Sequence, residues 1–228
     1  MSSQDLKNEL SVSHMSIIRY LNELERENFL KREHGGAVII DRELSETDFQ
    51  NRVDLHKEDK KIIAKRASKF FEGAKNIYID SGTTCLYLLE YLPKDINIYT
   101  NSIALAFKVT DYSLDNNIHL LGGNIKASTK AIIDLDNFEF LEKIKFDVSF
   151  IGANAISSNG NLTTPDHKEG LIKKIVSFNS KKVVVVADSN KYNKSDFYDF
   201  TPKKYFLVTD KKIDIRNKNL NIEVIYED

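Results

Sequence analysis

The chain has 228 residues, of which 41% are apolar and 29% are charged, with 33 Lys and Arg side chains against 34 Asp and Glu. This composition excludes a disordered chain and a collagen-like fibre, and the length allows one large domain together with a small one. The single cysteine, Cys85, excludes an internal disulfide and a cysteine-cluster metal site. No apolar run approaches the roughly 18 residues of a spanning helix, and the N-terminus lacks the apolar core of a signal peptide, so we expect a cytoplasmic protein.

The net charge of −1 gives no indication of nucleic-acid binding. Residues 1–42 are not basic either, since they hold six Lys and Arg side chains and seven Asp and Glu side chains. A DNA-binding surface in this segment would therefore need its basic side chains gathered on one face.

The first forty residues predict two short helices and a small hairpin. Asp5–Leu10 favours a short helix, and Ser13 is a good N-cap for a second one because its hydroxyl can accept a hydrogen bond from a free backbone N–H. Phe29–Arg32 and Ala37–Ile40 flank Gly35–Gly36 and predict a β-hairpin, which would be a wing. The side chains that face inward from the second helix are Ile17, Leu21 and Leu24.

Two helices joined by a tight turn, with polar side chains at the start of the second, match helix-turn-helix geometry. Basic side chains on the hairpin could reach phosphate oxygens. A helical hairpin with a serine at its turn also occurs without DNA binding, so the pattern alone leaves that alternative open. The side chains expected to contact DNA are Ser13, His14, Ser16, Arg19, Tyr20, Arg32 and His34.

Residues 41–56 are polar and predict a linker between a first domain over residues 1–40 and a body over residues 57–228. In the body, short apolar runs alternate with amphipathic stretches, which is typical of an α/β fold with a mostly parallel sheet and flanking helices. The predicted strands are 76–80, 96–100, 118–121, 148–153, 182–187, 205–209 and 221–226. The predicted helices are 57–72, 84–91, 102–111, 135–143 and 167–179.

Three of the predicted strands end in motifs that suit a ligand. In DSGTT (Asp80–Thr84), Gly82 permits close approach of a ligand, and the start of the following helix presents free N–H groups to an anion such as phosphate. TNS (Thr100–Ser102) and LGG (Leu121–Gly123) follow the next two strands. Ligands of open α/β sheets bind outside the carboxyl ends of the strands, so the three motifs predict one shared crevice, although each alone could be an ordinary turn.

Two further pairs of charged residues follow later strands. Glu169 and Lys173 are four residues apart, so they lie on one face of their helix, and spacing alone leaves an ordinary solvent-facing ion pair open as an alternative to a role in binding. Asp188 and Lys191 come directly after the strand at 182–187. Cys85 follows the DSGTT motif and is expected to be a small buried hydrophobe rather than a nucleophile.

The string VSHMSIIRYLNELERENFLKREHGGA (12–37) resembles the winged helix-turn-helix of the DeoR family of bacterial transcriptional repressors. Its middle departs from the family's Arg-Arg-Asp with Ile18, Arg19 and Tyr20, so that one arginine that would contact DNA is lost. The family carries a further helix before this string, which implies that the winged domain is truncated at its N-terminus.

Residues 57–228 resemble the effector domain of the same family over essentially their whole length, with the motifs in the expected order. The resemblance implies a fold similar to ribose-5-phosphate isomerase and a pocket for a phosphorylated sugar. Asn190 and Asp134 replace the family's usual Ser and Gly, and the second change implies a different loop shape. The effector-binding residues that the resemblance implies are Asp80, Ser81, Gly82, Thr83, Thr84, Asn101, Gly122, Gly123, Gly152, Asp166, Glu169, Lys173, Asp188 and Lys191.

These features predict a DNA-binding repressor of a sugar-metabolism operon, a homo-dimer or homo-tetramer that a phosphorylated sugar releases from double-stranded operator DNA. No catalytic residue, cofactor, metal or membrane contact is expected. Two alternatives stay open. One is an isomerase or deaminase that uses Asp80, Asp166, Glu169 or Asp188 as a base. The other is a metabolite-binding protein with an incomplete DNA reader.

Overall fold

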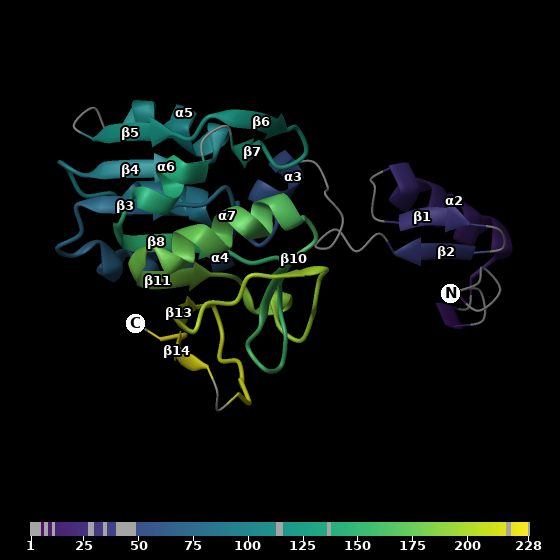
Figure 1. Ribbon diagram of the computed structural model, residues 1–228. Helices are drawn as coiled ribbons and strands as arrows, with labels where there is room; N and C mark the ends of the chain where they lie inside the picture. Colours follow the sequence, from purple (N-terminus) through teal and green to yellow (C-terminus); the bar gives the residue numbers. More distant parts are fainter. Residues whose placement is uncertain are drawn as a thin grey trace. The chain divides into compact units, whose positions relative to one another are not determined.

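The computed structural model describes residues 6, 9, 10, 12–26, 30–33, 36–39, 49–112, 116–135, 138–217 and 220–227. The chain divides into two compact units, Met1–Thr47 and Asp48–Asp228, whose buried residues form separate cores. In Figure 1 the first unit is drawn in purple, and the second runs from blue to yellow.

The first unit contains the helix α2 (His14–Arg26) and an antiparallel hairpin of β1 (Leu30–Glu33) and β2 (Gly36–Ile39). The hydroxyl of Ser13 accepts a hydrogen bond from the backbone N–H of Ser16 at 3.1 Å, as an N-cap does. The predicted second helix, its cap and the hairpin are therefore confirmed.

The core of the first unit is small among the residues that the structure describes. Ile17 and Leu21 of α2 pack with Leu30 of β1, so two of the three predicted inward positions are confirmed. The side chain of Leu24 lies outside the described residues, as do Phe29, Gly35 and Ile40 of the hairpin. Of the short helix predicted over Asp5–Leu10, the structure describes Leu6, Glu9 and Leu10, and all three are helical.

The second unit is built on a seven-stranded parallel sheet with the order β14-β13-β11-β8-β3-β4-β5. Each strand overlaps a predicted one, which confirms the α/β class and the parallel sheet. The strands are β3 (Asn76–Ile79), β4 (Asn97–Thr100), β5 (Asn117–Leu120), β8 (Phe146–Gly152), β11 (Ser180–Val186), β13 (Lys204–Val208) and β14 (Asn221–Ile225). The chain runs outward from β3 to β5 and returns on the other side of β3 at β8, so the strand order reverses between β3 and β8.

The helices cover both faces of this sheet. They are α3 (Phe49–Asp54), α4 (Lys57–Ala67), η1 (Ser68–Phe71), η2 (Cys85–Tyr91), α5 (Ile103–Tyr112), α6 (Phe138–Lys143), α7 (His167–Phe178) and η3 (Ser189–Lys191), where η denotes a 3₁₀ helix. Ile77 and Ile79 of β3 belong to the buried core that also contains side chains of α3, α4, η1, η2 and α5. Tyr78 belongs to the core on the opposite face, with α6 and α7. Figure 1 shows α6 and α7 in front of the sheet.

Two smaller antiparallel sheets have no counterpart among the predicted strands. One is a hairpin of β6 (Gly123–Lys126) and β7 (Ala131–Leu135), and its turn contains Lys130 with a φ of 54°. The other consists of β9 (Ala155–Ile156), β10 (Leu162–Thr164) and β12 (Tyr198–Asp199). Because β7 takes residues 131–135, the helix predicted over 135–143 begins only at Phe138.

The linker predicted over residues 41–56 overlaps the second unit. Its second half contains α3, whose Phe49 and Val53 are buried in the core of the body. These two residues are four positions apart and therefore share one helix face, which allows an otherwise polar segment to dock. Residues 41–48 lie outside the described part of the chain.

Candidate ligand-binding site

The candidate site lies where the strand order of the sheet reverses. Asp80 follows β3, and Gly152 ends the neighbouring strand β8. The backbone N–H of Asp80 donates to the carbonyl of Phe150 at 3.0 Å, which keeps the two strand ends together. Ligands of open α/β sheets bind at such reversal points, at the carboxyl edge of the strands.

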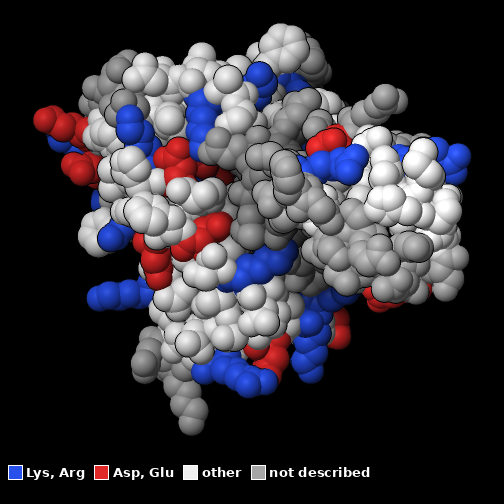
Figure 2. Space-filling view, turned by 90° about the vertical axis from the view of Figure 1, so that its right-hand side faces the viewer, with Lys and Arg blue, Asp and Glu red and all other residues white. Residues whose placement is uncertain are grey.

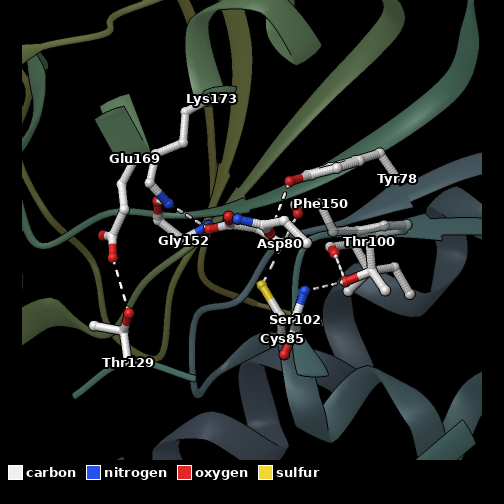
Figure 3. Close-up of polar contacts among 12 residues, drawn as sticks. Tyr78, Asp80, Cys85, Thr100, Ser102, Thr129, Phe150, Gly152, Glu169 and Lys173 are labelled. Atoms are coloured by element: carbon white, nitrogen blue, oxygen red, sulfur yellow. Dashed lines mark hydrogen bonds and ion pairs between the residues drawn. The ribbon is translucent and has the colours of Figure 1, made fainter. Parts of the chain in front are cut away.

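A buried charged cluster occupies this point (Figure 3). The ammonium of Lys173, from α7, forms an ion pair with Oδ2 of Asp80 and donates a hydrogen bond to the carbonyl of Gly152 at 3.1 Å. The same Asp80 oxygen accepts the N–H of Gly152 at 3.0 Å. The side chains of Asp80 and Lys173 are 1% and 5% exposed. The alternative of a solvent-facing ion pair between Glu169 and Lys173 does not hold, because both side chains are buried and Lys173 pairs with Asp80.

The electrostatics of the cluster keep Lys173 charged. Burial alone would lower the pKa of Lys173, but the nearby carboxylates of Asp80 and Glu169 outweigh it, so the pKa lies above the usual lysine value. Its Nζ also lies 5.6 Å from the ring centroid of Phe200, within the range of a cation–π contact. The site thus holds a fixed positive charge next to a carboxylate.

Glycines at two strand ends let these elements approach one another. A side chain at Gly152 would place its Cβ 3.3 Å from Oδ2 of Asp80 and 3.4 Å from Cα of Gly82, which is tighter than ordinary packing. Gly82 also accepts the N–H of Cys85 at 3.0 Å. The helix expected after DSGTT is the 3₁₀ helix η2, and the N–H of Cys85 at its start is already bonded rather than free for an anion.

The remaining DSGTT residues lie at the same edge. Ser81 and Thr84 are buried, and Thr83 is half-buried. Cys85 is fully buried, as expected, and burial raises the pKa of its thiol above the usual value. Its Sγ lies 3.9 Å from the carbonyl of Phe150 (Figure 3), so it packs between η2 and β8 rather than facing solvent.

Asn101, which follows β4, connects neighbouring elements through two side-chain hydrogen bonds. Its Oδ1 accepts the hydroxyl of Tyr78 at 2.8 Å, and its Nδ2 donates to the carbonyl of Ile132 at 3.1 Å. Burial raises the pKa of Tyr78 well above its usual value, so the phenol remains a donor. Asn101 is 1% exposed, and its amide fastens β7 to the edge of the sheet.

The start of α7 forms a second charged cluster. Asp166 is the N-cap, and its Oδ1 accepts the N–H of Lys168 at 2.8 Å and that of Glu169 at 3.3 Å. Its Oδ2 accepts the ammonium of Lys126 at 2.9 Å. Burial would raise the pKa of Asp166, but the bonds from Lys126 and from the two N–H groups lower it below the usual value.

Glu169 is buried beside this cap. Its Oε1 accepts the hydroxyl of Thr129 at 2.9 Å (Figure 3) and lies 3.7 Å from Nζ of Lys126. Lys126 and Thr129 both belong to the β6–β7 hairpin and were absent from the expected site residues. The hairpin consists of the run GNIK, the turn ASTK and the run AIID, and each run is too short for its alternation to predict a strand.

The third loop of the edge follows β11. Asp188 is 2% exposed, and its side chain accepts the N–H of Asn190 at 3.2 Å. Lys191 is half-buried. Burial lowers the pKa of the neighbouring Lys60 to about 8, with Asp188 opposing this shift and Lys191 adding to it. Lys60, in α4, lies outside the expected set, because a single lysine in an amphipathic helix carries no sequence signal.

The structure therefore brings most of the expected residues to one edge of the sheet. Val186 of β11 pairs with Gly152 of β8, which places the Asp188 loop next to the Asp80 cluster. Gly122 is exposed after β5, and Gly123 opens β6 with a φ of 143°. The site carboxylates Asp80, Asp166 and Glu169 are each bonded to a lysine or a hydroxyl.

The expected DNA contacts lie in the first unit. His14 and Arg19 are exposed, and the guanidinium of Arg19 lies 5.2 Å from the ring of Tyr20. The guanidinium of Arg32, on the hairpin, donates to Oδ1 of Asn22 at 2.7 Å, which ties the hairpin to α2. The hydroxyls of Ser13 and Ser16 are 2.9 Å apart. His34 lies outside the described residues.

The surface charge agrees with the balanced composition. On the face that Figure 2 shows, basic and acidic side chains of the described residues are interspersed, and neither sign dominates. Because the full chain has a net charge of −1, any attraction to DNA must come from the local arrangement of a few side chains rather than from the field of the whole molecule.

Two family models match this chain. One, described as a DeoR-like helix-turn-helix domain, matches residues 1–43, and the other, described as the DeoR C terminal sensor domain, matches residues 55–211. The chain belongs to the DeoR family. The DeoR resemblance of the two sequence segments is thereby confirmed.

DeoR-family regulators are among the relatives of this chain. The HTH-type transcriptional regulator GlpR of Haloferax volcanii is 33% identical over 87% of this chain and 78% of its own length. The glycerol-3-phosphate regulon repressor of Escherichia coli is 28% identical over 86% of this chain and 77% of its own length. A D-ribose-5-phosphate isomerase solved in complex with phospho-erythronic acid is 24% identical, with a TM-score of 0.43, over 60% of this chain and 54% of the isomerase chain.

The described residues of this DeoR-family chain contain neither a membrane-spanning helix nor a cluster of metal ligands. None of their helices is both long enough and apolar enough to cross a membrane. None of their His, Cys, Asp and Glu side chains form a group of three or more that could hold a metal ion.

Proposed function

We propose that this DeoR-family protein is a repressor of a sugar-metabolism operon, and that a phosphorylated sugar bound at the carboxyl edge of the sheet releases it from DNA. The observation that carries the proposal is the joining, in one chain, of a winged helix-turn-helix unit to a sheet whose reversal point gathers buried lysines and carboxylates. Its relatives GlpR and the glycerol-3-phosphate regulon repressor are transcriptional regulators, which supports a regulator rather than an enzyme.

The chemistry of the edge suits a phosphorylated sugar. Lysine ammonium groups form strong charge-assisted hydrogen bonds with phosphate oxygens, and carboxylates accept hydrogen bonds from sugar hydroxyls. Lys191 and Lys126 are the proposed phosphate partners, and Asp166 and Glu169 the proposed hydroxyl partners. Lys173 is held by Asp80, so in this proposal the pair shapes the floor of the pocket.

The remaining expected residues line the proposed pocket through their backbone or small side chains. We assign this role to Ser81, Gly82, Thr83, Thr84, Gly122, Gly123, Gly152 and Asp188. In this proposal Asn101 does not contact the ligand itself but supports the pocket, because its amide holds β7 in place.

On the DNA side, the start of α2 would enter the major groove while the hairpin contacts the backbone. His14, Ser16 and Arg19 are the proposed base and phosphate contacts, with Arg32 on the wing. A homo-dimer would place two such units on half-sites separated by about 10 base pairs, one helical turn.

Release by a ligand requires that the ligand binds better to the DNA-free arrangement than to the DNA-bound one. The same coupling free energy makes DNA weaken the affinity for the ligand. An effector without such a difference in affinity would bind and change nothing.

Fluorescence anisotropy with the DNA upstream of the gene tests the proposal. The full chain should bind this DNA in preference to a scrambled duplex, with an affinity that falls as salt rises. Ribose 5-phosphate, fructose 1-phosphate, fructose 6-phosphate and glycerol 3-phosphate are then added in turn, and one of them should lower the affinity for DNA. Sequence-independent binding, or turnover of a sugar phosphate in a parallel assay, would contradict the proposal.

A further inference from the structure

Two of the elements that form the candidate site contact the helix α3, and a third contacts the turn between α3 and α4. From the β6–β7 hairpin, the carbonyl of Ser128 accepts Nη2 of Arg52 at 3.3 Å. From η2, which follows DSGTT, the hydroxyl of Tyr87 donates to the carbonyl of Val53 at 3.0 Å. From η3, Nδ2 of Asn190 lies 3.4 Å from Nε2 of His56, the N-cap of α4 in the turn that follows α3.

The β6–β7 hairpin faces α3 and the ligand site at once. On the side of the ligand site, Lys126 forms an ion pair with Asp166, and the hydroxyl of Thr129 donates to Glu169. Ser128, which lies between these two residues in sequence, instead accepts a hydrogen bond from Arg52. Hydrogen bonds weaken steeply once their length or angle leaves a narrow range. A small displacement of this turn at the carboxylates therefore alters its bond to Arg52.

A ligand can displace the hairpin at little cost to the site. A phosphate that takes Lys126 leaves Asp166 with its two backbone N–H partners, Lys168 and Glu169. A sugar hydroxyl can replace the hydroxyl of Thr129 on Glu169 with a bond of the same kind. A bound ligand can thus replace the contacts of Lys126 and Thr129, while the hydrogen bonds by which Asp166 caps α7 remain.

The helix α3 is also the first element of the second unit along the chain. The unit begins at Asp48, and α3 begins at Phe49. Its C-terminal carbonyls are held by Lys60 of α4, which donates to Arg52 and, at 2.6 Å, to Leu55. The chain then turns at His56, which has a φ of 53°. Arg52 lies in the last turn of α3, so a change at its side chain acts on the same end of this short helix that Lys60 anchors.

We propose that the β6–β7 hairpin and Arg52 transmit ligand occupancy to α3, and through α3 to the segment that carries the DNA-binding unit. Arg52 is a positioning residue in this scheme, since it acts through its bond to Ser128 of the hairpin and not on the ligand itself. The inference rests on the proposed function. Its central step, the contact between the β6–β7 hairpin and α3, exists without ligand or DNA and can be measured by itself.

Hydrogen exchange of the full chain measures that link. In Lys126→Met the hairpin loses its tie to Asp166. We then expect the amides of residues 53–55, at the C-terminal end of α3 and just after it, to exchange at least threefold faster, with amides in β13 unchanged. Lys181→Met is the matched control, because it removes a lysine–carboxylate pair with Asp147 at the surface. Unchanged exchange in α3, or equal acceleration in β13 or in the control, would overturn the proposal.

A second experiment measures the coupling itself with the sugar phosphate that weakens DNA binding in the anisotropy assay. In Arg52→Met we expect the ratio of DNA affinities without and with this ligand to fall close to 1, while the affinity for ligand stays within about threefold. Arg52→Lys should restore part of the ratio. Arg66→Met, which removes an arginine bonded to the carbonyls of Thr209 and Asp210, should keep it.

The outcomes separate the two proposals. If none of the four sugar phosphates acts on DNA binding, the proposed effector class fails while the exchange experiment still decides the link between hairpin and α3. If Arg52→Met responds to the ligand as the wild type does, the link is refuted and the proposed function stands.

Discussion

The ion pair of Asp80 and Lys173 carries two charges that are almost fully removed from water. Breaking a buried pair by removing one partner leaves an uncompensated charge, which costs more than the pair contributes when intact. The carboxylate of Asp80 would keep the N–H of Gly152 as a partner but lose its counter-ion.

We therefore expect Lys173→Met to destabilise the second unit by about 3–5 kcal/mol, measured by denaturant unfolding followed by circular dichroism. The surface control Lys181→Met should cost less than about 1 kcal/mol, because that lysine is 74% exposed. The double variant Asp80→Asn with Lys173→Met should recover part of the loss. Equal costs for the buried and the surface lysine would show that the Asp80 site is open to water.

Asp147 gives the protein an acid-sensitive contact. Its side chain accepts the ammonium of Lys181 at 2.8 Å and the backbone N–H groups of Lys75 and Asn76 at 3.0 Å each. The hydrogen bond from Lys181 and those from the two N–H groups lower the pKa of Asp147 from 3.8 to about 2. A carboxyl with a depressed pKa in the folded state stabilises the fold above its unfolded pKa and loses that contribution as the pH falls.

The contribution of Asp147 should therefore be complete above about pH 4 and disappear as the pH falls towards about 2. Asp147→Asn should lower the free energy of unfolding at neutral pH by roughly 1–2 kcal/mol. Its unfolding free energy should also fall less steeply than that of the wild type between these two pH values. Parallel pH profiles of variant and wild type would contradict this assignment.

At the scale of elements, α7 depends on its N-cap. Asp166 closes the first turn of the helix and also anchors Lys126 of the hairpin, so two substitutions separate its roles. Asp166→Asn keeps a side-chain oxygen for the cap and removes the charge, whereas Asp166→Ala removes both.

We expect Asp166→Ala to cost about 1–2 kcal/mol of stability, and Asp166→Asn to cost less, by thermal unfolding. Asp166→Asn should nevertheless weaken the hold on the hairpin, which hydrogen exchange of residues 123–135 would detect. If both variants lose the same stability, the charge pair with Lys126 matters more than the cap.

At the scale of the whole molecule, the two units have separate cores among the described residues. Ile17, Leu21 and Leu30 form the first, and two much larger clusters on either face of the sheet form the second. The contacts that shape the candidate ligand site all lie within the second unit.

A fragment of residues 48–228 should therefore fold on its own and keep the sugar-phosphate site without binding DNA. A sugar phosphate at a hundred times its Kd should add about 2.7 kcal/mol to the unfolding free energy of the fragment, as in the full chain. Calorimetry of fragment and full chain, with anisotropy as the DNA assay, measures both properties. An unfolded fragment would show that the first unit contributes to the core of the second.

Local patterns in the sequence predicted the regular elements well. The apolar run at Val183–Ala187 predicted β11, and Ser13 predicted the start of α2, because both signals depend only on neighbouring residues. The docking of α3 and the β6–β7 hairpin escaped prediction. Phe49 and Val53 are buried only because α3 packs on the core of the second unit, which the local sequence does not reveal. The strands β6 and β7 are short, so they contain too few alternating positions to be recognised.

The sequence by itself determined the α/β fold class, the parallel strands, the DeoR family and the motifs at the strand ends. Only the tertiary structure decided which side chains those motifs meet: that Lys173 pairs with Asp80 rather than facing solvent, and that Lys126 and Thr129 hold the carboxylates of α7. The physical reason is the separation along the sequence over which each kind of interaction acts. Periodicity and capping act over a few neighbouring residues, whereas these contacts join residues from 40 to 93 positions apart, which only the packing of the sheet brings together.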